Sequence, residues 1–120
     1  MAELKMLLVD DEIDFLEPMA ARLAKRNVLC RTARSGEEAL EVLGKERLNC
    51  AVIDVKMPGM GGLELLRRMR REFPDLAVIL LTGHASVESG VQGMELGAFD
   101  YLMKPVDLDE LLDTVRRAIS

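Results

Sequence analysis

Acidic, hydroxyl and ammonium side chains follow four apolar segments of this sequence, each at the point where the segment ends. In chain order they are Asp10 and Asp11, Asp54, Thr82 and Lys104. Carboxylates that lie close together repel one another, and a hard divalent cation such as Mg²⁺, which takes few carboxylates and several waters, relieves that repulsion. A carboxylate beside a cation, an ammonium and a hydroxyl can accept a phosphoryl group, because phosphoryl transfer depends mainly on positioning and charge neutralisation.

Asp54 is the strongest candidate for a nucleophile among these residues. It stands alone at the end of an apolar segment, where an unpaired carboxylate is costly to bury. The others each have a structural explanation as well. Asp10 and Asp11 could cap a helix, Thr82 could be a hydrogen-bonded hydroxyl, and Lys104 could be a solvated ammonium. Their occurrence together at four segment ends favours a shared site.

Five short apolar segments alternate with segments of helical periodicity, which predicts an α/β fold. Several of the apolar segments are apolar on both faces, as in a parallel sheet that helices cover on both sides. Right-handed crossovers then favour a doubly wound sheet, in which ligands bind outside the carboxyl ends of the strands. The expected strands are residues 5–9, 28–33, 50–55, 77–81 and 99–103, and the expected helices lie around residues 16–23, 35–44, 63–69, 86–96 and 107–119.

Local signals modify three of the expected helices. Pro18 lies about two turns into the first helix and is expected to kink it or remove a backbone hydrogen bond. Ser35 followed by Glu38 is a capping-box pattern that starts the second helix. Gly90 and Gly93 weaken the fourth helix by about 1 kcal/mol each relative to alanine.

Length and composition favour one soluble domain that spans residues 1–120. Hydrophobic residues make up 49% of the chain and the net charge is −5, which argues against direct contact with nucleic acid. The basic run 67–71 is most simply a solvated helix face. No apolar run approaches about 20 residues, so we expect neither a membrane span nor secretion, and a cytoplasmic location. Cys30 and Cys50 are expected to be reduced and buried.

The polar residues also carry a family resemblance. Asp10-Asp11, Asp54 followed by 57–59 (Met-Pro-Gly), Thr82-Gly83 and Lys104-Pro105 occur in the order that is found in bacterial response-regulator receiver domains. The similarity extends from about Met6 to Ile119. It implies a flavodoxin-like, CheY-like sheet with the strand order 2-1-3-4-5 and five flanking helices.

The resemblance also implies a role for each site residue. Asp54 would take a phosphoryl group from the phosphohistidine of a histidine kinase or phosphotransfer protein. Asp11 and Asp54 would ligate Mg²⁺ directly, together with the backbone carbonyl of Lys56, and Asp10 would hold the ion through water. Lys104 would pair with the phosphoryl oxygens, and its peptide bond to Pro105 would be cis.

Thr82 and Tyr101 match the switch pair of the same family. Phosphorylation would draw the Thr82 hydroxyl towards the new oxygens, and the Tyr101 ring would turn inward behind it. Residues 86–119 would form the face that meets an output domain, a partner protein or a second copy of the chain. His84 and Lys56 occupy positions that the family uses to tune phosphate lifetime, although His84 could also be a base, a phosphodonor or a bystander.

Two other functional classes remain open from the residues alone. Phosphatases of the haloacid-dehalogenase type also form an aspartyl phosphate, but they need an Asp-x-Asp arrangement, and position 56 is a lysine. A receiver-like interaction module that no longer accepts phosphate usually lacks one of the acidic pair, the acceptor or the lysine, and this chain has all of them. We therefore expect a protein that is not an enzyme, and that catalyses only its own phosphotransfer and slow dephosphorylation.

Overall fold

The strands and helices alternate along the chain as the apolar periodicity predicts. The computed structural model describes residues 4–83 and 87–120, with the backbone alone at residue 87. The strands are β1 (Leu4–Val9), β2 (Val28–Ala33), β3 (Cys50–Asp54), β4 (Ala77–Thr82) and β5 (Asp100–Met103). The helices are α1 (Ile13–Ala24), α2 (Gly36–Lys45), α3 (Gly62–Glu72), α4 (Val87–Glu95) and α5 (Leu108–Ile119).

All five strands pair in parallel, in the order β2-β1-β3-β4-β5. This order confirms the prediction of a doubly wound sheet. Val9 on β1 lies opposite Ile53 on β3, and Thr82 on β4 lies opposite Met103 on β5. Because parallel strands all end at the same edge, this register brings the residues that follow β1, β3, β4 and β5 to one edge of the sheet.

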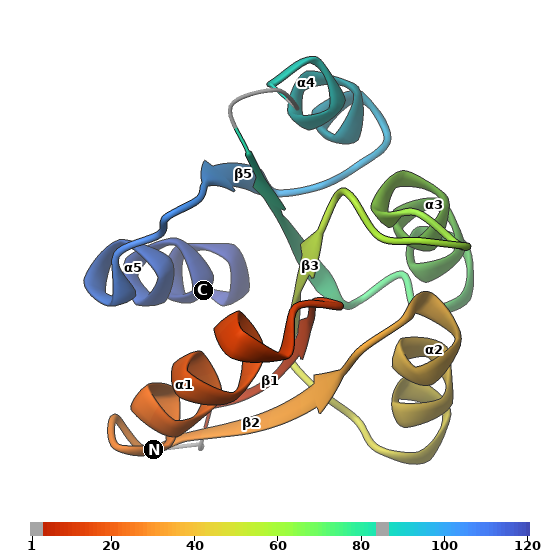
Figure 1. The fold of residues 1–120 in the computed structure, drawn as a ribbon. Coiled ribbons are helices and arrows are strands. Elements are labelled where there is room, and N and C mark those ends of the chain that lie inside the picture. Colours follow the sequence, from red (N-terminus) through yellow and green to blue (C-terminus); the bar gives the residue numbers. More distant parts are fainter. Residues whose placement is uncertain (1–3, 84–86) are drawn as a thin grey trace.

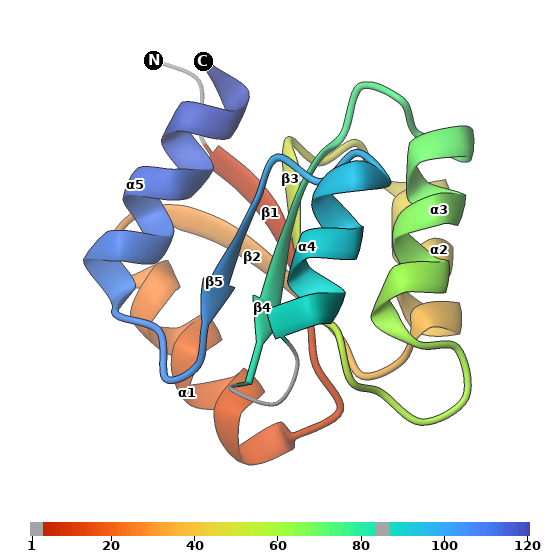
Figure 2. The ribbon, with the colours of Figure 1, turned by 90° about the horizontal axis from the view of Figure 1, so that it is seen from above.

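Helices cover the sheet on both faces (Figure 1). The helices α1 and α5 lie on one face, whereas α2, α3 and α4 lie on the other, and Figure 2 shows α4 lying beside β4 and β5. Successive strand residues point to opposite faces, so each inner strand contributes side chains to two hydrophobic cores, one on each face of the sheet. One core holds Leu8, Val52, Ile79 and Leu81 against α1 and α5, and the other holds Leu7, Ile53, Val78 and Leu80 against α2 and α3.

Side-chain caps start two of the helices. The Ser35 hydroxyl accepts a hydrogen bond from the Glu38 amide at 3.1 Å, and the Asp107 carboxylate accepts one from the Glu110 amide at 3.2 Å. The capping box of α2 is incomplete, because the Glu38 carboxylate accepts from the amide of Arg34, the residue before the cap. The helix α1 continues through Pro18, which has no amide hydrogen to donate, so the predicted loss of one backbone hydrogen bond does not end the helix.

The two cysteines are free thiols, as expected. Cys50 is buried and Cys30 is half-buried. Burial raises the pKa of the Cys50 thiol to about 12 and that of Cys30 to about 11, so both thiols stay protonated and unreactive at neutral pH. None of the described helices combines the length and apolar character that a membrane crossing requires.

Candidate functional site

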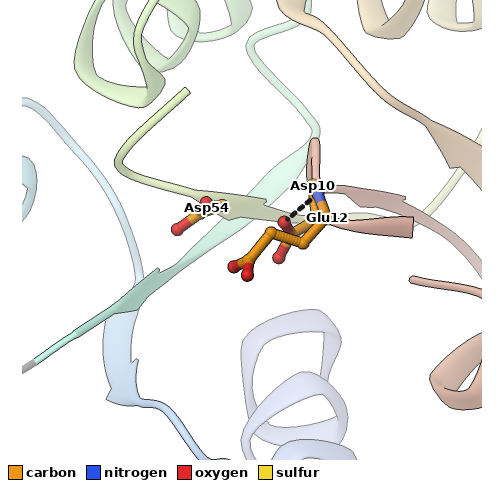
Figure 3. Close-up of side chains that lie close together, drawn as sticks. All are labelled: Asp10, Glu12 and Asp54. Atoms are coloured by element: carbon orange, nitrogen blue, oxygen red, sulfur yellow. Dashed lines mark hydrogen bonds between the residues drawn. The ribbon is translucent and has the colours of Figure 1, made fainter. Parts of the chain in front are cut away.

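Three carboxylates meet at the carboxyl edge of the sheet. Asp10 directly follows β1 and Asp54 ends β3, and the pairing of Val9 with Ile53 places these two aspartates side by side. The Glu12 amide donates a hydrogen bond to the Asp10 carboxylate at 2.9 Å, which turns the chain back over the strand end. Oxygen atoms of Asp10, Glu12 and Asp54 lie within 4.8 Å of one another (Figure 3).

Lys104 brings a positive charge to this group from the end of β5. Its amide donates to the Thr82 carbonyl at 2.8 Å, which extends the pairing of β5 with β4 to the edge of the site. The ammonium Nζ lies 2.6 Å from Asp10, 3.2 Å from Glu12 and 3.9 Å from Asp54. The Phe15 ring supports the ammonium, with its centroid 4.5 Å from Nζ.

The surroundings of Lys104 act on its pKa in opposite directions. Burial alone would lower the pKa of this ammonium. The hydrogen bond to Asp10 and the negative charges of Asp54 and Asp10 raise the pKa above its usual value instead. Lys104 therefore carries its full charge throughout the physiological pH range.

Asp54 is the most perturbed carboxyl group of the site. It is 6% exposed. Burial and the nearby charge of Asp10 raise its pKa from 3.8 to about 6, although Lys104 and a hydrogen bond from the Lys56 amide oppose the rise. The charge of Asp11 adds a smaller upward contribution. Burial and the charge of Asp10 thus make the ionised form of Asp54 less favourable than Lys104 and the Lys56 amide make it favourable.

This raised pKa predicts a pH-dependent stability difference between the protein and an Asp54→Asn variant. A group with a raised folded-state pKa stabilises the fold below its unfolded pKa, and that contribution is lost as the pH rises through the folded pKa. Without metal, we therefore expect Asp54→Asn to be the more stable protein at pH 8, by on the order of 2 kcal/mol. The difference should fade as the pH falls from about 6 towards 3.8.

Urea unfolding of both proteins at several pH values, in the presence of a chelator, measures this difference. Added Mg²⁺ should narrow the gap at pH 8, because the ion would stabilise only the form that has the carboxylate. If the difference in free energy of unfolding between the two proteins were the same at pH 8 and pH 4, the pKa of Asp54 would not be raised in the folded protein.

Thr82 is fully buried at the end of β4, and its Oγ1 has no hydrogen-bond partner among the residues that the structure describes. A buried hydroxyl without a partner is unfavourable unless something else satisfies it. Thr82 lies opposite Met103 and Tyr101 lies opposite Leu80. Paired strand residues point to the same face, so the Thr82 hydroxyl and the Tyr101 ring share the face that α4 covers.

Four of the predicted site residues come together as expected: Asp10, Asp54, Thr82 and Lys104 all lie at one edge. The predicted cis peptide bond between Lys104 and Pro105 is confirmed. Asp11 is half-buried, and its carboxylate is not one of the three that lie within 4.8 Å of one another.

Two other predicted residues, Lys56 and Tyr101, lie outside the group of carboxylates. The side chain of Lys56 is exposed, and its backbone amide is the part that contacts Asp54. Tyr101 lies on β5, which β4 separates from β3, and His84 lies outside the described residues.

Sequence reasoning missed Glu12. Its carboxylate, rather than that of Asp11, joins Asp10 and Asp54 and binds Lys104. The signal in the sequence is the acidic run Asp10-Asp11-Glu12, of which the predicted site includes only the first two residues.

Comparison with known proteins agrees with the geometry. The family model described as the response regulator receiver domain matches residues 6–116. The chain is 39% identical over 113 residues to the DNA-binding transcriptional regulator NtrC of Escherichia coli K12, and 34% identical over 119 residues to the response regulator protein PilR of Pseudomonas aeruginosa. These matches cover 94% and 99% of this chain but only 24% and 27% of the relatives, so the chain spans about a quarter of their length.

Solved structures of isolated receiver domains match along nearly their whole length. A receiver domain protein from Clostridium thermocellum superposes with a TM-score of 0.92 at 33% identity, covering 97% of this chain and 94% of that chain. The receiver domain of NtrX from Brucella abortus gives a TM-score of 0.90 at 30% identity, covering 95% and 97%. The chain therefore belongs to the response regulator receiver domains, the phosphoacceptor domains of two-component signalling.

Proposed function

We propose that Asp54 is the phosphoacceptor of this receiver domain and takes its phosphoryl group from the phosphohistidine of a histidine kinase or phosphotransfer protein. The observation that carries this proposal is the site itself. Asp54 is a buried carboxylate with a raised pKa, and it lies within reach of two further carboxylates and one ammonium. Carboxyl groups whose pKa is shifted by burial and by specific charged neighbours cluster at functional sites, and this group has three carboxylates beside a single ammonium.

The transfer needs one nucleophilic oxygen and charge neutralisation. A carboxylate oxygen of Asp54 would attack phosphorus in line with the phosphorus–nitrogen bond of the donor. That bond breaks, and its electron pair returns to the imidazole of the donor histidine. The Lys104 ammonium, 3.9 Å from the Asp54 carboxylate, is positioned to neutralise the incoming phosphoryl oxygens. The Thr82 hydroxyl supplies a donor that such an oxygen would satisfy.

The carboxylates of Asp10, Glu12 and Asp54, which lie together at the sheet edge, fit Mg²⁺, because this ion prefers a few carboxylate oxygens and several waters. Asp11, Asp54 and the backbone carbonyl of Lys56 would hold the ion directly, and Asp10 would hold it through water. Glu12, whose carboxylate lies beside those of Asp10 and Asp54, adds to the negative charge at the same edge. When bound, Mg²⁺ would neutralise the carboxylates and the charge that develops on the phosphoryl oxygens.

The α4–β5–α5 side of the domain is the surface that we expect to carry the signal onward. Three large apolar side chains on or next to α4 are exposed there, namely Val91, Met94 and Phe99. An output domain, a partner protein or a second copy of the chain would bind this side. The relative NtrC is named as a DNA-binding regulator. Because this domain carries a net charge of −5, we do not expect the domain itself to contact DNA.

Incubation with Mg²⁺ and a small phosphodonor tests this function. Phosphoramidate has the phosphorus–nitrogen bond of phosphohistidine, and acetyl phosphate is an independent donor. The intact mass of the protein should increase by one phosphoryl unit, and Asp54→Asn or chelation of the metal should prevent the increase. Incorporation should be stoichiometric, without the steady-state turnover of a phosphatase. An unchanged mass with both donors, or equal incorporation in Asp54→Asn, would contradict the proposal.

A further inference from the structure

Gly90 of α4 lies directly against the ring of Tyr101. Gly90 is buried and faces β5, where the half-buried Tyr101 ring packs beside the core between the sheet, α2 and α3. A Cβ atom at position 90 would lie 2.8 Å from Cδ2 of the ring, 2.9 Å from Cγ and 3.2 Å from Cε2. These distances are well below the van der Waals contact distance of two carbon atoms, about 3.5 Å.

A Cβ at position 90 would meet the Tyr101 ring near the point where the ring is attached. Cγ is the atom through which the ring is attached, so a small tilt of the ring cannot relieve the overlap. The whole ring would have to leave its rotamer, or α4 would have to move away from the sheet. At Gly93, one turn further along α4, the nearest atom is a terminal methyl group of Leu80, which is a more flexible obstacle.

We propose that Gly90 is the positioning residue of the Thr82–Tyr101 switch. We call its contact with the tyrosine the ring seat. The absence of a side chain at position 90 allows the Tyr101 ring to lie between β5 and α4, so that a movement of the ring is transmitted to α4. The ring seat itself is independent of phosphorylation, whereas its use in switching rests on the function proposed above.

The composition of the chain makes the ring seat directly observable. Tyr101 is the one tyrosine and there is no tryptophan, so the intrinsic fluorescence of the protein reports on this ring. In Gly90→Ala, quenching of the fluorescence by acrylamide should increase, because the ring is displaced towards solvent. Gly44→Ala in α2 is the matched control, since a Cβ there meets nothing within 4 Å, and its quenching should equal that of the unchanged protein. Equal quenching in all three proteins would overturn the proposal.

The stability of Gly90→Ala towards urea, measured with and without the Tyr101 ring, tests the ring seat even if Gly90→Ala is less stable. Alanine is a better helix former than glycine, so the substitution should stabilise α4 wherever nothing obstructs the methyl group. We expect Gly90→Ala to have a lower urea midpoint than the unsubstituted protein. When Tyr101 is replaced by alanine, so that the ring is absent, adding Gly90→Ala should raise the urea midpoint. A decrease of the same size in both backgrounds would show that the ring is not what Gly90 accommodates.

Phosphorylation tests the role of the ring seat in switching. With phosphoramidate and Mg²⁺, Gly90→Ala should gain the same mass as the unchanged protein, but its tyrosine quenching should change less on phosphorylation. An equal change in both proteins would contradict the coupling. If neither protein gains mass, the proposed phosphoacceptor function fails, while the quenching and stability results still decide the ring seat.

Discussion

Replacing Lys104 with alanine is expected to slow phosphorylation of Asp54 by about 10²- to 10³-fold, the usual effect of removing one group that stabilises transition-state charge. The Lys104 ammonium is the one cationic side chain within 4.0 Å of Asp54 among the described residues. Its contact with the Phe15 ring and its hydrogen bonds to Asp10 and Glu12 hold it in place. The rate of mass increase with phosphoramidate and Mg²⁺ measures the effect.

Metal binding separates this catalytic role from a merely structural one. Loss of a positive charge beside three carboxylates should leave the affinity for Mg²⁺ unchanged or increase it, as calorimetric titration would show. Lys45→Ala is a matched control, because Lys45 is an exposed lysine at the end of α2 that pairs with Glu41. A Lys104→Ala variant that lost its metal affinity together with its phosphorylation rate would contradict the assigned role.

Gly62→Ala is expected to destabilise the fold by about 2 kcal/mol, as overpacking of a dense site does. A Cβ at this position would overlap the carbonyl oxygen of Asp54 and lie 2.7 Å from Cα of Val55. Both obstacles are backbone, and the Gly62 amide already donates to the Val55 carbonyl at 2.9 Å. The loop that carries Lys56 would have to move away from β3. Displacement of site groups by about 1 Å can slow a reaction about 10²-fold.

Gly61→Ala provides a control at the adjacent position. The nearest atom to its Cβ would be the Val55 carbonyl oxygen at 3.8 Å, and its φ of −73° suits any residue. Gly61 is the N-cap of α3, so alanine should cost less than about 1 kcal/mol there. Urea unfolding and the phosphorylation rate should therefore distinguish the two neighbouring glycines. Equal effects of both substitutions would show that the close approach of α3 to Asp54 has no consequence.

The fold could be predicted from the sequence because its signals are local and repeated. Segments such as 50–55 and 77–81 are apolar on both faces, and only a sheet covered on both sides buries such segments. Parallel pairing then places the residues that follow the strands at one edge. The positions of Asp10, Asp54, Thr82 and Lys104 follow from that topology without any knowledge of side-chain geometry.

Contacts that depend on how elements approach one another could not be predicted. Whether residue 11 or residue 12 faces Lys104 depends on the turn after β1, which the hydrogen bond from the Glu12 amide to Asp10 sets. An acidic residue before a helix is also a common cap, so the acidic run alone does not distinguish Glu12 as a site residue.

The glycines show the same limit of sequence reasoning. From helix propensity alone, Gly90 was expected only to weaken α4. The structure gives it a packing partner, the Tyr101 ring. Propensity describes a residue in an isolated helix, whereas the space available at position 90 is determined by the neighbouring strand.

Chemical trapping of the acylphosphate tests the central claim most directly. Borohydride reduces an aspartyl phosphate to homoserine, so peptide mapping after reduction identifies the residue that carried the phosphoryl group. The peptide that contains Asp54 should carry this modification, and chelation of Mg²⁺ should abolish it. Modification at Asp10, Asp11 or Glu12 instead, or phosphorylated protein without any reducible carboxyl group, would contradict the assignment of Asp54 as the acceptor.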